Sequence, residues 1–545
     1  MTAGECLARR LRRVAAGLIA LGAAASPAWA QDRPAAAASE PMVLREWHLQ
    51  PLEGIDDATL QRLTLPYLRK PFGVAQAQQL RDALLAEMAA RGLSLGGAAL
   101  RVLDAPRGIV ALQVVEPRLR RIELSASADA PLADPQVLQV LAREGVHDGA
   151  LLDLRRLDAA MFALNDLPGV RAQASLAPSG DEARYDLVIE RGWRRQAEGS
   201  VDLDNHGSRF NGRWRIGGLL RWNEPLDLGD NLDLRLQLAE QRGLASARLA
   251  YELPLDQLLP VAPSAWRTSL ALSALSYELG DVFAPLQARG RARVIDLGLS
   301  RPLQRSRQSN VVLRLGASHK RLEDRFDAFG LRTDKATRDV NLGLSFEARD
   351  GWGGGGYSGG ALTLQAGSLD IRSPGARADD AALGTRSAQG GFGKLGLQLN
   401  RLQALPLPGS TAWSVYGGLS ALWASRNLDP SEKFALGGAG AVRAYPPGEA
   451  AADRAAIATV ELRHAIGAQW SVFALGDWGR ARLQARPLAG VDNQRRLRAA
   501  GLGVFFSDPA WFTLRGTLAW PGSAPRLAEP DDTGPRLNLQ LQRGF

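Results

Sequence analysis

The chain ends with Arg536-Leu-Asn-Leu-Gln-Leu-Gln-Arg-Gly-Phe545, a run in which apolar and polar side chains alternate. Successive side chains of a β-strand point to opposite faces, so Leu537, Leu541 and Phe545 share one face and the amides share the other. Such a strand can meet lipid on one side and water on the other. Backbone groups in hydrocarbon must all be paired, and only a closed sheet leaves no unpaired edge. Many such runs in series therefore predict a transmembrane β-barrel.

The same pattern recurs throughout residues 194–545. We count sixteen runs, which start near residues 196, 212, 230, 243, 264, 287, 307, 335, 357, 388, 411, 453, 468, 494, 509 and 535. Tryptophans lie at both ends of several apolar faces, as Trp214 and Trp222 do, and paired aromatic girdles suit the two membrane interfaces. A soluble β-sandwich or propeller would not explain that arrangement. The predicted fold class is a 16-stranded antiparallel transmembrane β-barrel.

Loop lengths predict how the barrel is oriented. If the N-terminal part lies in the periplasm, the connections from odd to even strands face outward and should be the longer ones. The outward connections include 323–334, 369–387 and 425–452, whereas the inward ones include 305–307 and 466–468. The outward connections are longer than the inward ones, as this orientation predicts.

The N-terminus has the features of a secretory signal peptide, which we place at residues 1–30. A basic segment precedes the short apolar stretch 14–25, and Ala28-Trp29-Ala30 is a suitable cleavage site. Residues 31–41 form an Ala/Pro-rich leader that we expect to be disordered. The one cysteine, Cys6, lies in the signal peptide. The mature chain is therefore expected to have no disulfides or thiolate metal site.

Two α+β segments precede the barrel, at residues 42–117 and 118–193. Each has the predicted order strand, helix, helix, strand, strand, and each is long enough for a small core. In the first segment, helix 74–91 carries an apolar stripe that ends at Met88. Gly92 follows as the residue after the C-cap.

Composition and motifs do not indicate an enzyme or a nucleic-acid-binding protein. The net charge is +9, but the arginines are spread among strand residues, which favours an arginine-lined lumen and anionic lipid headgroups at the rims. The five histidines share no metal-ligand spacing. The Gly-rich segment 351–360 fits the patterns G-x-G-x-x-G and G-x-S-x-G, but it leads into a strand instead of a helix. No catalytic residue, cofactor or metal is predicted.

The longest outward loop is the candidate functional segment. A 28-residue connection without a strand pattern is long enough to demand a role. Its tip carries Arg443 between Val442 and Tyr445. If the loop folds into the lumen, Arg443 needs a carboxylate there, because an unpaired buried charge is costly. Asp477 is the candidate. Its side chain is on the face of its strand opposite to that of Trp470, and that face would line the lumen. The alternative is an exposed surface loop.

These features together resemble the two-partner secretion transporters (TpsB type) of the haemolysin and haemagglutinin secretion-activation family. Leu436-Gly437-Gly438 and Val442-Arg443-Ala444-Tyr445 resemble the loop-six Val-Arg-Gly-Tyr/Phe motif, with Ala444 in place of the glycine. Gly476-Asp477-Trp478-Gly479 resembles the strand that supplies the aspartate partner of that arginine. Further stretches that match the family are Glu461-Leu-Arg463, Asn165-Asp-Leu-Pro-Gly169, Asp204-Asn-His-Gly-Ser208 and Pro225-Leu-Asp-Leu-Gly-Asp230.

The resemblance implies two periplasmic POTRA modules, POTRA 1 at 42–117 and POTRA 2 at 118–193, and a barrel in the outer membrane of a Gram-negative bacterium. It implies a loop-six motif and lumen anchor made of Gly437, Gly438, Val442, Arg443, Tyr445, Asp477 and Gly479. The segment before POTRA 1 is too short for the plug helix of some members, so loop six is expected to be the main obstruction of the pore.

The implied function is a pore that recognises an unfolded partner exoprotein, with an N-terminal secretion domain, in the periplasm and translocates it to the cell surface. Outer-membrane lipid is an implied partner. The barrel assembly machinery is another, through the C-terminal Phe545. The alternatives are an outer-membrane protein assembly or insertion factor of the same superfamily and a passive porin.

Overall fold

The structure, a computed structural model, describes residues 42–126, 134–180, 183–193, 196–259 and 265–545. The expected signal peptide and leader lie outside these residues. The chain divides into two compact units. One contains the first α+β module and two short segments from further along the chain, and the other contains most of the second module together with the barrel. Among the described residues, no helix is long and apolar enough to cross a membrane.

The first module has the predicted order of elements. They are β1 (Met42–Val43), β2 (Glu46–Leu49), α2 (Asp57–Thr64), β3 (Pro71–Phe72), α3 (Val74–Ala90), β4 (Gly97–Asp104) and β5 (Ile109–Val115). The sheet order is β2-β5-β4, with β2 parallel and β4 antiparallel to β5. Leu84 and Met88 of α3 pack with Leu60 and Leu112 in the core. Gly92 has a φ of +83°, as its predicted position after the helix requires. The short β1–β3 pair was not predicted.

The second module repeats the arrangement. Its elements are β6 (Arg118–Ala126), α4 (Asp134–Arg143), α5 (Leu154–Asn165), β7 (Val170–Pro178) and β8 (Arg184–Trp193). The sheet order is β6-β8-β7. Both helices contribute buried leucines, Leu141 and Leu164, and β8 contributes Leu187 and Ile189.

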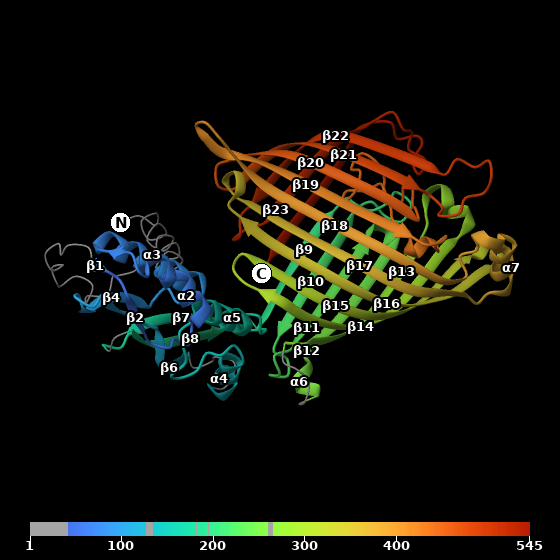
Figure 1. Ribbon diagram of the computed structural model, residues 1–545. Helices are drawn as coiled ribbons and strands as arrows, with labels where there is room; N and C mark the ends of the chain where they lie inside the picture. Colours follow the sequence, from blue (N-terminus) through green and yellow to red (C-terminus); the bar gives the residue numbers. More distant parts are fainter. Residues whose placement is uncertain (1–41, 127–133, 181–182, 194–195, 260–264) are drawn as a thin grey trace, which may run out of the picture. The chain divides into compact units, whose positions relative to one another are not determined.

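Sixteen antiparallel strands form a closed barrel (Figure 1). They are β9 (Ala197–Asp204), β10 (Arg215–Asn223), β11 (Asn231–Ala239), β12 (Leu244–Pro254), β13 (Arg267–Glu278), β14 (Ala288–Arg305), β15 (Ser309–Phe326), β16 (Leu331–Asp350), β17 (Gly356–Ile371), β18 (Gly390–Leu407), β19 (Ser410–Ala424), β20 (Arg454–Ile466), β21 (Trp470–Arg482), β22 (Gln494–Ser507), β23 (Thr513–Pro521) and β24 (Arg536–Gly544). Every predicted run corresponds to one strand and starts within four residues of it. The predicted fold class is confirmed.

The C-terminal run closes the barrel. β24 pairs with β9, from Gln540 opposite Asp204 to Gly544 opposite Ser200. Leu537 is 49% exposed and Phe545 58% exposed on the outer surface, whereas Asn538 is buried on the lumenal side. The tryptophans at the ends of β10, Trp214 and Trp222, are also exposed. This is the lipid-facing and water-facing alternation that the sequence predicts.

One predicted connection is wrong. The segment 323–334 is mostly strand, because Glu323 pairs with Asp334 and Phe326 with Leu331, which leaves a short turn between β15 and β16. Here the strands continue beyond the apolar belt with polar residues on both faces, so the alternation that marks a strand is lost. The outward connection after β17 contains a helix, α7 (Pro374–Ala382).

Candidate functional site in the barrel lumen

Loop six, residues 425–453 between β19 and β20, folds into the barrel. Its residues Leu436, Val442, Ala444 and Tyr445 are fully buried. They form an apolar cluster with lumenal side chains of four strands, which are Ala455, Ile457, Ala481, Leu497, Ala499 and Ala519. Burial of this apolar surface is one of the two forces that hold the loop inside.

A buried arginine supplies the other force. The guanidinium of Arg443 donates from Nε to Oδ2 of Asp477 at 2.9 Å and from Nη2 to Oδ1 at 2.6 Å. Its remaining Nη1 donates to Oε1 of Glu461 at 2.5 Å. Arg443 is 4% exposed, and Asp477 and Glu461 are 0% and 1% exposed. A bidentate arginine–carboxylate pair is directional as well as strong, so it fixes the position of the loop tip.

Asp477 also fixes the backbone of the loop. It accepts hydrogen bonds from the backbone N–H of Arg443 at 3.1 Å and from the hydroxyl of Thr459 at 3.0 Å. With the two guanidinium bonds it therefore accepts four. Because a buried carboxylate with this many donors has no need of water, Asp477 can lie fully inside the lumen wall.

Glu461 connects the tip of loop six to a further strand, β23. It accepts from Nη2 of Arg515 on β23 at 2.6 Å and from Nη2 of Arg463 on its own strand at 2.6 Å. The guanidinium of Arg515 lies 4.8 Å from the ring centre of Phe473. Two carboxylates thus hold three arginines in one network, and removal of either carboxylate leaves excess positive charge in a confined space.

The glycines of the motif make room for the loop. A Cβ on Gly479 would lie 2.8 Å from Cγ2 of Val442, and one on Gly437 would lie 2.4 Å from the carbonyl oxygen of Pro446. Gly438 has a φ of +125°, which favours glycine. Ala444 does not have a positive φ. An alanine therefore fits where the family motif has glycine.

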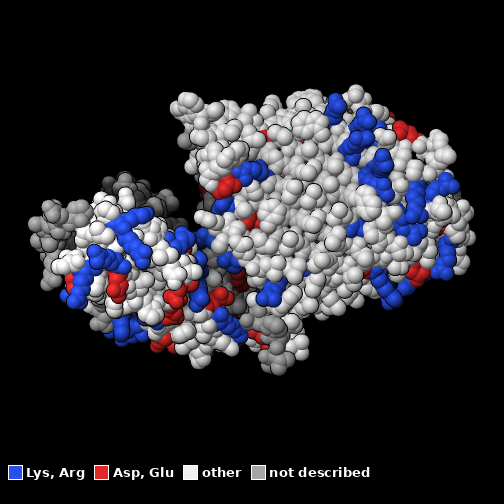
Figure 2. Space-filling view, in the orientation of Figure 1, with Lys and Arg blue, Asp and Glu red and all other residues white. Residues whose placement is uncertain are grey.

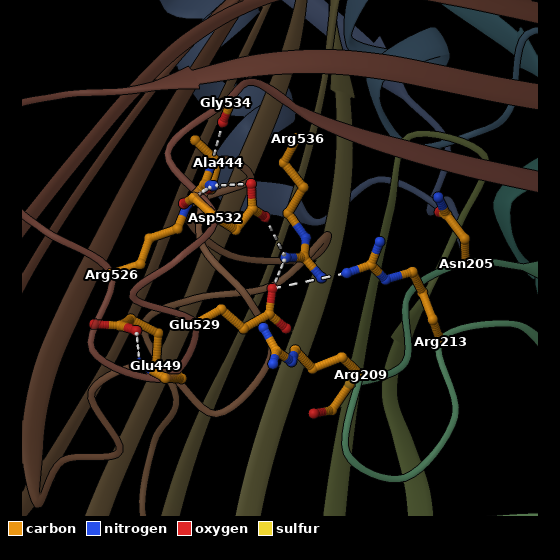
Figure 3. A network of polar contacts seen from close by, with 12 residues as sticks. Asn205, Arg209, Arg213, Ala444, Glu449, Arg526, Glu529, Asp532, Gly534 and Arg536 are labelled. Atoms are coloured by element: carbon orange, nitrogen blue, oxygen red, sulfur yellow. Dashed lines mark hydrogen bonds and ion pairs between the residues drawn. The ribbon is translucent and has the colours of Figure 1, made fainter. Parts of the chain in front are cut away.

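A second outward loop packs against the first, and Figure 3 shows its Arg526 beside Ala444 of loop six. This is loop eight, residues 522–535 between β23 and β24. Nε of Arg526 donates to the carbonyl oxygen of Ala444 at 2.9 Å, and the hydroxyl of Tyr445 donates to the carbonyl oxygen of Ala524 at 3.0 Å. In return, buried Glu449 accepts from the backbone N–H groups of loop eight at residues 527 and 528. The two loops therefore form one packed unit.

The start of loop six has its own anchors, made by lysines. Nζ of Lys320 lies 2.5 Å from Oε1 of Glu432, and Lys394 also pairs with this carboxylate. Nζ of Lys335 lies 2.9 Å from Oδ2 of Asp429. These are three of the five lysines in the chain. Loop six is thus tied to β15, β16 and β18 at its start. Its tip is tied to β20 and β21, and to β24, where Nδ2 of Asn538 donates to the carbonyl oxygen of Arg443 at 3.1 Å.

The sequence analysis predicted that Arg443 pairs with Asp477, and the structure brings these two side chains together. It also brings Val442, Tyr445 and Gly479 to the same place, and puts Gly437 and Gly438 at the turn beside them. Sequence reasoning quoted Glu461-Leu-Arg463 as a match to the family but gave these side chains no role in the lumen. It missed Arg515, Asn538 and the lysine anchors. Glu461 carried a signal, since it lies between the outward-facing Val460 and Leu462, but many inward polar residues share that pattern.

Comparison with known proteins identifies relatives of the chain. The family model described as haemolysin secretion/activation protein ShlB/FhaC/HecB matches residues 185–506. The heme/hemopexin transporter protein HuxB of Haemophilus influenzae is 24% identical over 372 residues, which cover 67% of this chain and 63% of HuxB, so the match spans less than two thirds of that relative.

Solved structures share the fold. CdiB from Escherichia coli superposes with a TM-score of 0.73 at 18% identity and covers 94% of this chain and 92% of its own. CdiB from Acinetobacter baumannii gives a TM-score of 0.67 at 16% identity, with coverage of 99% and 98%.

Proposed function

This chain belongs to the haemolysin secretion/activation protein family ShlB/FhaC/HecB, and we propose that it is a two-partner secretion pore of the outer membrane. It would recognise an unfolded partner exoprotein in the periplasm and translocate it to the cell surface. The observation that carries this proposal is loop six, which occupies the lumen and is held there by Arg443, Asp477 and Glu461.

The lumen suits the passage of an unfolded chain. Its wall presents paired charges such as Arg221 with Asp233 and Arg248 with Asp296. A wall of this kind offers water and hydrogen-bonding groups to a passing backbone and little apolar surface to retain its side chains. The chemistry is transport without a covalent step.

Loop six would control the passage. Beside its apolar cluster it is held by hydrogen bonds and ion pairs, which can be exchanged for contacts with water or with the moving chain. Arg443 and Asp477 would hold the loop in one position, Tyr445 would tie it to loop eight, and Gly437, Gly438, Val442 and Gly479 would allow the tight packing at its tip.

The two modules would capture the partner. Each sheet has exposed edges, β4 in the first module and β7 in the second, to which an extended segment could add as a further strand. Exposed Val102 and Leu103 near the end of β4 would contribute apolar contacts. Lipid would contact the apolar outer belt, and the exposed terminal Phe545 would be read by the barrel assembly machinery.

Secretion by variants tests the proposal. The chain is co-expressed with exported proteins from the same locus, and the medium is assayed. Arg443→Ala should insert and keep heat-modifiable gel mobility but secrete poorly. Arg289→Ala, which breaks an exposed ion pair with Asp327 outside the lumen, is the matched control and should secrete normally. Normal secretion by Arg443→Ala would remove loop six from the mechanism, and loss of unrelated outer-membrane barrels on depletion of the chain would favour an assembly factor instead.

A further inference from the structure

A cationic cluster lies on the outer surface of the barrel. We define it as Arg291 and Arg293 on β14, Arg321 on β15 and Arg338 on β16, all exposed. Arg291 and Arg293 share a strand face with the lipid-facing Ile295, which is 48% exposed. The arginines therefore face outward, away from the lumen.

The four arginines are close together. Glu323, the cross-strand partner of Arg291, forms its ion pairs with Arg325 and Arg332. Arg293 is the direct cross-strand partner of Arg321, and Arg338 is the partner of His319, which accepts a hydrogen bond from Nε of Arg321 at 3.3 Å. Among the residues that the structure describes, no carboxylate pairs with any of the four, although the nearby Arg289 and Arg325 have acidic partners. Like charges directly opposite each other on a sheet are unfavourable. An external anion would remove that repulsion.

The cluster lies at a defined depth. On β14 the outward face changes from Arg293 to Ile295, and on β16 from Arg338 to Val340, which is 59% exposed. β14 begins at the outward end of the barrel, so the arginines lie just beyond the outward edge of the apolar belt. Figure 2 shows a band of Lys and Arg across the barrel at the end that carries α7, next to a surface with little charge. Lipid headgroups of the outer leaflet occupy this depth.

An apolar groove runs beside the cluster. It has a volume of about 450 Å³ and is lined by Leu236, Leu238, Ala247 and Ala274 together with Arg291 and Arg293. The groove exists because β12 and β13 place alanines on the outer surface between the leucines of β11 and the arginines of β14. Its shape and polarity suit a hydrocarbon chain that ends next to a phosphate.

We propose that this surface is a binding site for one phosphorylated, multiply acylated saccharolipid of the outer leaflet. The phosphates would be bound by Arg291, Arg293, Arg321 and Arg338, because arginine is suited to bidentate phosphate contacts. One acyl chain would lie in the groove. The proposal rests on the outer-membrane location and not on the transport mechanism, so the two can fail separately.

Binding of lipid A to the full chain tests the proposal. Native mass spectrometry of the detergent-purified protein measures retention of lipid A, dephosphorylated lipid A and phosphatidylglycerol. The variant Arg291→Gln/Arg293→Gln should bind lipid A at least about tenfold more weakly, since each charge-assisted contact is worth that much or more. Arg301→Gln, on the same face of β14 but at its inward end, is the matched control and should bind as the wild type does. Heat-modifiable gel mobility verifies that each variant is folded.

Further binding measurements distinguish the possible ligands. Ala247→Trp fills the groove without a change of charge and should weaken lipid A binding. Unchanged lipid A binding by this variant would overturn the assignment of the groove to an acyl chain. Equal retention of phosphatidylglycerol and lipid A by the wild type would mean only a general attraction for anionic lipid, which overturns the proposal. Unchanged lipid A binding by Arg291→Gln/Arg293→Gln would also overturn it, as would an equal loss in Arg301→Gln.

Discussion

Removal of Asp477 should release loop six from the lumen wall. In Asp477→Ala, Arg443 loses two guanidinium bonds and the bond from its backbone N–H, and Glu461 alone must then balance three arginines. Breaking a buried ion pair by removal of one partner costs about 3–5 kcal/mol. The apolar cluster remains, so we expect local opening of the loop and not loss of the barrel.

Hydrogen exchange measures this opening directly. A loss of about 3–5 kcal/mol corresponds to a rise of about two to three and a half orders of magnitude in the exchange rate of loop-six amides, since about 1.4 kcal/mol is tenfold.

A matched control separates the anchor from general charge effects. Asp233→Ala breaks a lumenal pair with Arg221 whose side chains are 25% and 45% exposed, and such pairs are worth at most about 1 kcal/mol. Its loop-six exchange should match the wild type. Wild-type exchange rates of the loop-six amides in Asp477→Ala would refute the view that this ion pair anchors the loop.

Three further predictions concern the packing around the loop and one periplasmic turn. Gly479→Ala places a methyl group 2.8 Å from Val442 and should destabilise the closed loop by ~1–3 kcal/mol, seen as faster proteolysis, whereas Gly417→Ala, whose methyl meets nothing, should not. Glu449→Ala removes an acceptor of two loop-eight N–H groups, so cleavage between residues 522 and 535 should become faster without new cleavage elsewhere. Burial raises the pKa of Glu224 to about 7. The contribution of this side chain to the stability of the folded turn is therefore full below the ordinary carboxyl pKa of about 4, and it is lost as the pH rises through 7. Amide hydrogen exchange in the turn 224–230, corrected for the intrinsic effect of pH on the exchange rate, should therefore slow from about pH 8 to about pH 5. Glu224→Gln should abolish this pH dependence.

The elements that sequence analysis located well are those with a local signature. The helix that ends near Met88 and Gly92, and all sixteen barrel strands, follow from patterns of neighbouring residues. The boundary between β15 and β16 did not, because Asp324 and Arg325 continue the strand outside the membrane, where no apolar face marks it.

The sequence alone determined that this chain forms a closed barrel with an arginine-tipped loop, because alternation, turns and loop length are properties of adjacent residues. Only the tertiary structure decided that Glu461 shares Arg443 with Asp477, that loop eight packs against loop six, and that outward arginines on three strands form one cluster. Each of these depends on strand register around the barrel and on how deeply a loop enters it. Such contacts join residues far apart in the chain, and no local pattern specifies them.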